Sequence, residues 1–175
     1  MKDKLNLGCG TVILSDYVNL DSYKFRGVDV VWDLNNVPYP FKKDIFSRVL
    51  MSHVLEHLED VPKTLQEIWR ISKPGAIVDI GVPYFSSLNA VKDPTHKHFF
   101  AAATFDFFER GKINNYFDKS YIANFRIMEC KIIYSNHPFL RWANILVNLN
   151  QRFYERFFAY IFPSQVLEVK LKVVK

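Results

Sequence analysis

The sequence contains little cysteine and no long apolar run. Its two cysteines, Cys9 and Cys130, lie far apart and neither belongs to a CxxC motif, so the fold needs no disulfide framework. This pattern is typical of the reducing cytoplasm, where we expect the protein to be located. The longest uncharged stretch, residues 80–91, is short and is interrupted by Pro83, which excludes a transmembrane helix. Residues 1–3 lead directly into a predicted strand, so we expect no signal peptide.

The composition is that of a folded domain, with 49% hydrophobic and 23% charged residues in a chain of 175. These values exclude a disordered or collagen-like chain. We expect one domain over residues 1–175, divided into a cofactor-binding half (1–83) and an acceptor side (84–175). The net charge of +5 is uneven, since residues 110–175 carry 11 basic and 4 acidic side chains. Most aromatic residues also lie in the second half.

The hydrophobic pattern predicts strands that alternate with helices. A helix is expected after Asp60, which resembles an N-cap, and it should end at 73–75 where Pro and Gly follow Lys. A short helix is predicted over 104–110 and an amphipathic helical stretch over 139–160. The predicted strands cover residues 4–7, 17–21, 28–32, 45–51, 76–82, 125–134 and 166–174. This order indicates an α/β fold with a mostly parallel sheet, whose ligands bind at the carboxyl ends of the strands.

A glycine loop and two acids follow the first three strands. Gly8 and Gly10 come directly after strand 4–7, Asp21 ends the second strand and Asp33 follows the third. Glycine lets the backbone approach a ligand, and an acid at the position of Asp21 can bind both hydroxyls of a ribose. The third glycine of the dinucleotide fingerprint is missing and no full helix precedes Asp21, which argues against NAD. The pattern favours an adenosine carried without phosphates.

Five stretches together resemble the class I S-adenosylmethionine-dependent methyltransferases: LNLGCG (5–10), YVNLD (17–21), DVVWDLNNVPYPF (29–41), IFSRVLMSHVLEHLEDV (45–61) and EIWRISKPGAIVDIGVP (67–83). The resemblance implies a Rossmann-like, seven-stranded sheet of order 3-2-1-4-5-7-6 with strand seven antiparallel. It also implies S-adenosyl-L-methionine as the cofactor and an enzyme of the methyltransferase class. The family usually has N-terminal helices that cover the cofactor, but only a few residues precede the first predicted strand here. We therefore expect these cap helices to be lacking and the lid over the cofactor to come from elsewhere.

The resemblance assigns cofactor-binding roles residue by residue. Asp21 would hold the ribose, Asp33 and Leu34 would flank the adenine, and Ser52 and His53 would lie beneath the sulfonium. The methionine part would contact the glycine loop through Asn6, Gly8, Cys9 and Gly10.

His53, Glu56 and His57 have the i, i+3, i+4 spacing that places side chains on one helix face. This is metal-ligand spacing, and methyltransferases acting on quinone precursors or small-RNA ends have the similar ExxEH. Here a histidine replaces one acid and no partner acid is evident. We therefore expect no metal, with Glu56 and His57 capping and orienting the helix instead.

The segment Asp93-Pro94-Thr95-His96 lies in a long loop after the fifth strand, at the expected mouth of the site. DPTH followed by aromatics resembles methyltransferases of surface-polysaccharide and glycan assembly. An attacking hydroxyl must lose its proton, and histidine has a suitable pKa. We expect His96 to be the catalytic base and Asp93 to orient it, with His98 and His57 as further catalytic candidates.

The amphipathic stretch 139–160 is expected to pack on the sheet edge. A homodimer interface and a peripheral membrane contact stay open as alternatives. Nucleic acid is disfavoured because no RNA-binding signature is present. The basic charge of residues 110–175 favours an anionic acceptor.

The function predicted from the sequence is methyl transfer from S-adenosylmethionine to an oxygen of a sugar, glycan or other small-molecule acceptor, by in-line attack assisted by a histidine base. One alternative is a non-catalytic cofactor-binding or scaffold subunit that needs a partner chain. Another is a metal-assisted methyltransferase that acts on RNA ends or catechol-like groups.

Overall fold

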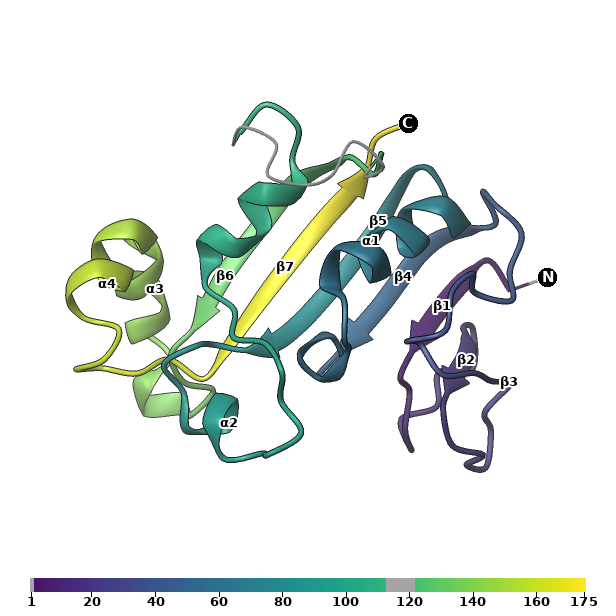
Figure 1. Ribbon diagram of the computed structural model, residues 1–175. Helices are drawn as coiled ribbons and strands as arrows, with labels where there is room; N and C mark the ends of the chain where they lie inside the picture. The colour runs from purple at the N-terminus through teal and green to yellow at the C-terminus, as the bar shows by residue number, and fades with distance from the viewer. Residues whose placement is uncertain (1, 113–121) are drawn as a thin grey trace.

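The protein was analysed as a computed structural model that describes residues 2–112 and 122–175. One seven-stranded sheet has the order β3-β2-β1-β4-β5-β7-β6 (Figure 1). Strands β1 to β5 pair in parallel, and β7 is antiparallel to both of its neighbours. The strands are β1 Lys4–Leu7, β2 Val18–Asp21, β3 Val30–Val31, β4 Phe46–Ser52, β5 Ser72–Pro83, β6 Phe125–Ile133 and β7 Val166–Val173. The predicted fold class and strand order are confirmed.

Helix α1, Val61–Ile71, covers one face of the sheet (Figure 1). It begins where predicted, because the Asp60 side chain accepts a hydrogen bond from the Lys63 backbone at 2.9 Å. Its inward stripe of Leu65, Ile68 and Ile71 is fully buried. The helix ends earlier than expected, and β5 begins at Ser72 instead of residue 76. Ser72 is already extended, and its hydroxyl donates to the carbonyl of Ile68 at 2.6 Å.

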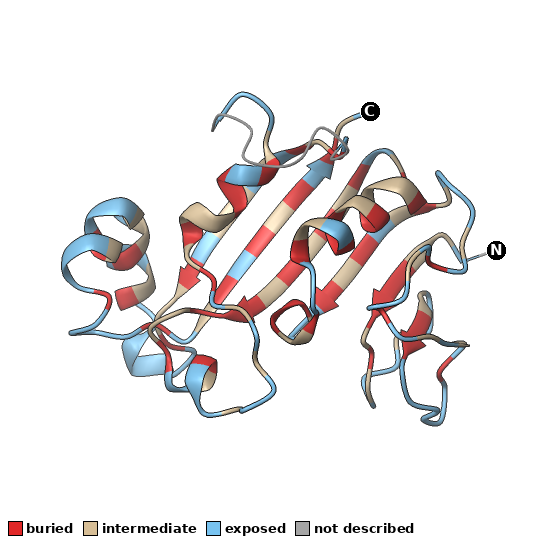
Figure 2. Cartoon of the chain, in the orientation of Figure 1, coloured by how far each residue is buried: buried red, intermediate tan, exposed pale blue. Residues whose placement is uncertain are grey.

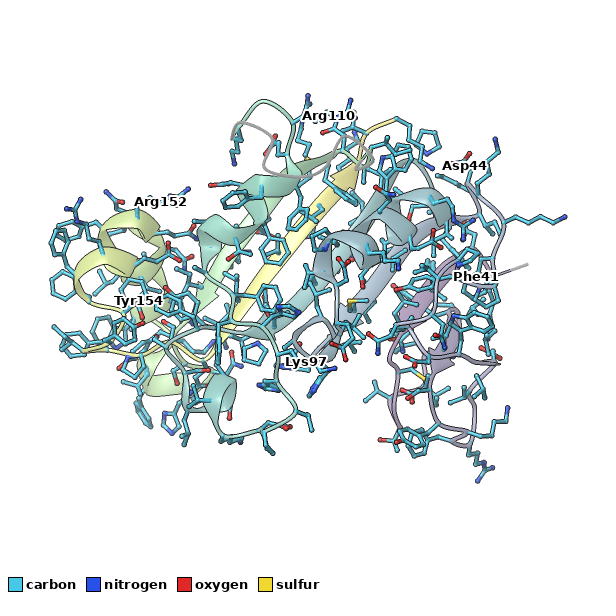
Figure 3. The ribbon with its side chains drawn as sticks, in the orientation of Figure 1. Phe41, Asp44, Lys97, Arg110, Arg152 and Tyr154 are labelled. Carbon is cyan, nitrogen blue, oxygen red and sulfur yellow. The ribbon has the colours of Figure 1, made fainter. Side chains whose placement is uncertain are left out.

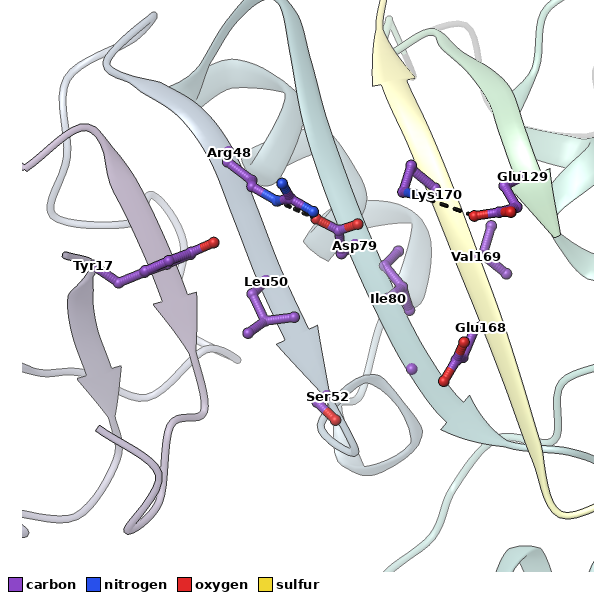
Figure 4. Close-up of a pocket in the computed structure, with 11 residues that line it drawn as sticks. Tyr17, Arg48, Leu50, Ser52, Asp79, Ile80, Glu129, Glu168, Val169 and Lys170 are labelled. Carbon is purple, nitrogen blue, oxygen red and sulfur yellow. Dashed lines mark hydrogen bonds and ion pairs between the residues drawn. The ribbon is translucent and has the colours of Figure 1, made fainter. Parts of the chain in front are cut away.

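The opposite face of the sheet is polar over β4, β5 and β7. Arg48 pairs with Asp79 at 2.6 Å, and Lys170 pairs with Glu129 at 3.2 Å (Figure 4). Burial alternates along these strands, as Figure 2 shows. Parallel sheets are usually buried on both faces and read as continuous apolar runs. Here the charged side chains suit a sheet face that is exposed to solvent and is not covered by helices.

The C-terminal helical stretch is shorter and more broken than predicted. It comprises the 3₁₀ turn η3, Pro138–Leu140, and the helices α3, Ala143–Leu149, and α4, Gln151–Phe157. The break falls at Asn150, whose side chain accepts from the Phe153 backbone at 3.0 Å and caps α4. No helix in the described part of the chain is long and apolar enough to cross a membrane.

Helix α3 packs against the edge strand β6, as expected. The Asn148 side chain accepts from the Ile132 backbone N–H at 2.9 Å and donates to its carbonyl at 2.7 Å. Asn144 accepts from the Tyr134 N–H at 2.7 Å. These side chains satisfy backbone groups that would otherwise leave an open sheet edge.

Three short elements lie near the carboxyl ends of the strands or beside the sheet. The 3₁₀ turn η1, Leu55–His57, follows β4, and helix α2, Leu88–Val91, lies in the long loop after β5. The helix predicted over 104–110 is the 3₁₀ helix η2, Ala102–Phe108.

Candidate active site

The loop after β1 uses its two glycines differently. Both have a left-handed backbone, with φ of 64° at Gly8 and 52° at Gly10. A Cβ on Gly8 would lie 2.3 Å from Cγ2 of Val54, whereas a Cβ on Gly10 would meet nothing within 4 Å. Gly8 is therefore required by packing within the protein, and Gly10 exposes backbone that a ligand can approach.

Asp21 lies next to this open backbone, because β2 pairs with β1. One of its carboxylate oxygens accepts from the Gly10 N–H at 2.8 Å, and the other accepts from the Tyr23 N–H at 2.9 Å. A carboxylate has about four lone-pair sites, so Asp21 keeps capacity to accept hydroxyl groups. Its position and chemistry fit the ribose of an adenosine cofactor.

Asn6 and Cys9 lie beneath the loop and not on its open side. Asn6 is buried, and its side-chain NH₂ donates to the Val12 carbonyl at 3.0 Å and to Asn19 at 3.2 Å. Cys9 is buried as well, and this burial raises the pKa of its thiol. Both residues hold the shape of the loop.

The residues after β3 differ in exposure. Asp33 is exposed, and its Oδ1 accepts from the backbone N–H of Asn35 at 2.9 Å and from its side chain at 3.1 Å. Leu34 is buried in the core. Asp33 is thus free on the solvent side, while Leu34 supports the loop from within.

His53 follows Ser52, the exposed last residue of β4, and it corrects one sequence prediction. The expectation that His53, Glu56 and His57 share one helix face is wrong, because η1 begins only at Leu55 and His53 has a left-handed backbone with φ of 55°. The turn nevertheless brings Nδ1 of His53 to 3.4 Å from Oε1 of Glu56. Contact with Glu56 raises the pKa of His53.

Glu56 is the most unusual residue of the site. Its side chain is only 1% exposed, and neither carboxylate oxygen has a hydrogen-bond partner. Buried polar groups in folded proteins almost always have one. Its nearest cationic or imidazole groups are His53 and His96, whose Nε2 lies 4.0 Å from Oε1.

The part of the loop after β5 that contains the DPTH motif, residues 93–98, is called the DPTH loop, and its backbone is hydrogen-bonded to η1. The N–H groups of Lys97 and His98 both donate to the Glu56 carbonyl, at 2.8 and 3.3 Å. The Lys97 ammonium, labelled in Figure 3, also contacts Glu59 at 2.5 Å. The loop therefore lies over the carboxyl end of β4, with His96 directed toward Glu56.

His96 is held in one tautomer. Its Nδ1 lies 3.0 Å from the Ala90 carbonyl, which can only accept, so Nδ1 carries the proton and Nε2 has a lone pair. Nε2 also lies 3.9 Å from Asp93, and the ring packs edge-on against His57 at 4.6 Å. By contrast, Nε2 of His98 donates to the Leu58 carbonyl at 2.9 Å, so this histidine supports the loop.

A family model described as a methyltransferase domain matches residues 2–126, most of the chain. The chain belongs to this methyltransferase family. No curated protein matches the sequence significantly. The expectation of S-adenosylmethionine as the cofactor agrees with the family and with solved structures described as dependent on it.

Solved structures with the fold of this methyltransferase domain include three with a TM-score of 0.59. An S-adenosylmethionine-dependent methyltransferase from Archaeoglobus fulgidus is 18% identical over 97% of this chain and 85% of its own. The complex of the Haloferax volcanii Trm112 methyltransferase activator with a putative methyltransferase matches at 16% identity, over 99% and 84%. The [4+2]-cyclase SpnF matches at 14%, over 98% and 75%. These similarities show the fold, and the cyclase shows that the fold carries other reactions.

Sequence reasoning missed how two parts of this methyltransferase domain meet. It treated His53, Glu56 and His57 separately from the DPTH loop, whereas the structure brings His96 to Glu56 and His57. It also missed Thr95, which lies between His57 and Asp93. The signal in the sequence was that Glu56 and His57 follow β4, while His96 follows the neighbouring strand β5.

Proposed function

We propose that this protein transfers the methyl group of S-adenosylmethionine to an oxygen of a sugar or glycan acceptor. The observation that carries the proposal is Asp21, which has spare acceptor capacity beside the open backbone of Gly10. His96, in the loop that follows β5, faces Glu56 after β4, at the carboxyl edge of the same parallel sheet. The family membership supports the reaction class.

When bound, the cofactor supplies an electrophilic methyl group on a cationic sulfonium. Asp21 would accept hydrogen bonds from the ribose hydroxyls, and the exposed Asp33 would lie beside the adenine. Ser52 and His53, at the end of β4, would lie below the sulfonium. The carboxylates here suit a cationic ligand better than a phosphate-bearing one.

His96 would act on the acceptor oxygen. In the simplest form, its Nε2 lone pair takes the hydroxyl proton while the O–CH₃ bond forms and the C–S bond breaks. The carboxylates of Asp93 and Glu56, at 3.9 and 4.0 Å, would stabilise the imidazolium that results. The Nδ1–H bond to Ala90 fixes the ring for this role.

The surface of α3 and α4 supports an anionic, lipid-carried acceptor. A largely apolar groove of about 510 Å³ lies along these helices, and large side chains such as Phe139, Leu149 and Tyr160 are more than 70% exposed around it. Arg141, between η3 and α3, and Arg156, on α4, are both exposed, whereas Arg152 pairs with Asp106 (Figure 3). Glycans are often built on carriers that combine an apolar chain with phosphate, and this surface offers both complements.

Helix α4 is connected to the acceptor side of the site. Oε1 of Glu155 accepts from the Ala102 backbone at 2.7 Å and from the Tyr84 hydroxyl at 3.3 Å. The rings of Tyr84 and Tyr154 stack at 6.2 Å. A carrier bound along α3 and α4 would thus lie beside the segment that follows β5.

The decisive experiment is calorimetry with S-adenosylmethionine and S-adenosylhomocysteine, followed by a screen of nucleotide sugars and lipid-linked glycans with a labelled methyl donor. We expect micromolar cofactor binding and label transfer to a hydroxyl of the glycan. Absence of cofactor binding would reject the reaction class. Cofactor binding without any transfer by the purified chain, restored by a partner, would favour the subunit alternative, for which the Trm112 complex among the structural neighbours is a precedent.

A further inference from the structure

We propose that Glu56, His57 and His96 form a binding site for one divalent transition-metal ion. Each residue offers one ligand atom, and these atoms all lie within 4.8 Å of one another. The ligands come from two segments, η1 and the DPTH loop, which the Glu56 carbonyl joins through hydrogen bonds from Lys97 and His98. The site is therefore built by the fold and does not depend on a flexible surface cluster.

Both histidines are held in the tautomer that a metal needs. Nδ1 of His96 donates to the Ala90 carbonyl, which leaves a lone pair on Nε2. The Thr95 hydroxyl donates to Asp93 at 2.7 Å, so it accepts from Nδ1 of His57 at 2.9 Å. His57 thus also has its lone pair on Nε2. Metal-binding histidines typically donate their other N–H to a carbonyl or carboxylate-linked group in this way.

Glu56 provides the negative charge, and neither of its carboxylate oxygens has a hydrogen-bond partner, although Nδ1 of the exposed His53 lies 3.4 Å from Oε1. The side chain is 1% exposed and both oxygens are without hydrogen bonds, which is costly for a buried carboxylate. A proton on His96 would not relieve this cost well, because 4.0 Å is too long for a hydrogen bond. A metal ion between the carboxylate and the two imidazoles would contact all three.

The ligand types select the metal. Two imidazole nitrogens and one carboxylate oxygen form the set found in catalytic zinc sites and in non-haem iron sites, and they do not suit Mg²⁺ or Ca²⁺. Three protein ligands leave at least one coordination position open. An acceptor hydroxyl or a water molecule could fill it.

The consequence for catalysis rests on the proposed function, while the metal site itself does not. A hydroxyl bound to the metal loses its proton more readily, because the positive charge lowers its pKa. In the metal-loaded protein, Nε2 of His96 would then be a ligand and would not take the proton itself. Methyl transfer would depend on the metal.

The test is a titration of the chelator-treated, full-length protein with Zn²⁺, followed by calorimetry and metal analysis. We expect one Zn²⁺ per chain with micromolar or tighter affinity, and at least about tenfold weaker binding by Glu56→Gln and His96→Ala. His137→Ala is the matched control, because His137 is exposed and lies outside the cluster. Circular dichroism checks that each variant is folded, and Co²⁺ absorption bands report histidine coordination in the wild type without any variant.

No stoichiometric Zn²⁺ binding by the wild type, or equal binding by Glu56→Gln, would overturn the site. Binding of S-adenosylmethionine to the metal-free protein is measured separately. A protein that binds the methyl donor but no metal would reject only this inference, and one that binds metal but no methyl donor would reject only the proposed function. Methyl transfer that survives chelation would overturn the catalytic role of the metal.

Discussion

Nε2 of His96 lies 4.0 Å from Oε1 of Glu56, although the two residues belong to different loops at the carboxyl ends of β4 and β5. Two backbone N–H groups of the DPTH loop bind the carbonyl of the same Glu56. One residue therefore positions the loop through its backbone and faces the loop histidine with its side chain.

Replacement of His96 by alanine should lower the rate of methyl transfer about 10²- to 10⁴-fold, because the acceptor oxygen loses the group that activates it. Cofactor affinity, measured by calorimetry, should stay unchanged. His137→Ala should transfer at the wild-type rate. A larger loss in His98→Ala than in His96→Ala would move the catalytic role to His98.

Asp21→Ala should weaken S-adenosylmethionine binding about 10- to 100-fold, since hydrogen bonds to a charged group contribute about 1.5–3 kcal/mol. The affinity of Asp21→Asn should lie between those of the wild type and Asp21→Ala, because one side-chain oxygen remains to accept a hydrogen bond. Asp16→Ala is a suitable control, as Asp16 is exposed and forms an ion pair with Lys4 on the surface. Undiminished binding by Asp21→Ala would contradict the ribose assignment.

Gly8→Ala should destabilise the protein by about 2–5 kcal/mol, the sum of a left-handed backbone and a clash with Val54. Gly10→Ala should cost only about 1–2 kcal/mol, because nothing lies near its Cβ. The Val54→Ala change should partly relieve Gly8→Ala in a double-mutant cycle. Urea unfolding measures all three, and equal losses for the two glycines would refute the distinction.

Glu67→Gln should lose stability in a pH-dependent way. Burial raises the pKa of Glu67, but hydrogen bonds from Arg70 and from the Tyr39 N–H outweigh it, so the pKa falls below its usual 4.5. Because the pKa of Glu67 is lower in the folded than in the unfolded protein, its ionised form adds to the free energy of unfolding at pH values above the unfolded pKa. This contribution is lost as the pH falls through the pKa of the folded protein. The difference from wild type, about 1–3 kcal/mol at pH 7, should shrink below about pH 4.5. Glu168→Gln, at an exposed position, should show no such trend.

Arg141→Gln should weaken binding to vesicles that contain anionic lipid about fivefold, because a basic side chain near such a surface contributes about 1 kcal/mol. Lys42→Gln, exposed but far from α3 and α4 in the sequence, is the control. Co-sedimentation at increasing salt measures the effect. Binding that ignores lipid charge and salt would argue against an anionic carrier.

The strand order was predictable because the short apolar strands, the glycine loop and the acids repeat a pattern that the resemblance identifies. The start of α1 was predictable for a local reason, the Asp60 cap. Its end was not, because Ser72 pairs with Phe46 in the sheet, and such pairing overrides the local Pro-Gly signal.

The site was only partly predictable. Asp21 and Gly10 could be found because strand ends meet at one edge of a parallel sheet. The backbone at His53 could not be found, since a non-glycine residue with positive φ has little sequence signal. The meeting of His96 with Glu56 depends on how a long loop folds back, and the break at Asn150 depends on a single side-chain cap.

The uncovered polar face over β4, β5 and β7 adds to the exposed surface of the protein, and this surface affects the response to denaturant. The accessible surface is 10209 Å², against about 8900 Å² for a compact protein of 20.6 kDa, so less area remains to be exposed on unfolding. The urea m-value and the heat-capacity increment both scale with that area. Both should therefore lie below the values of a doubly wound domain of equal length, and the thermal stability curve should be correspondingly flat.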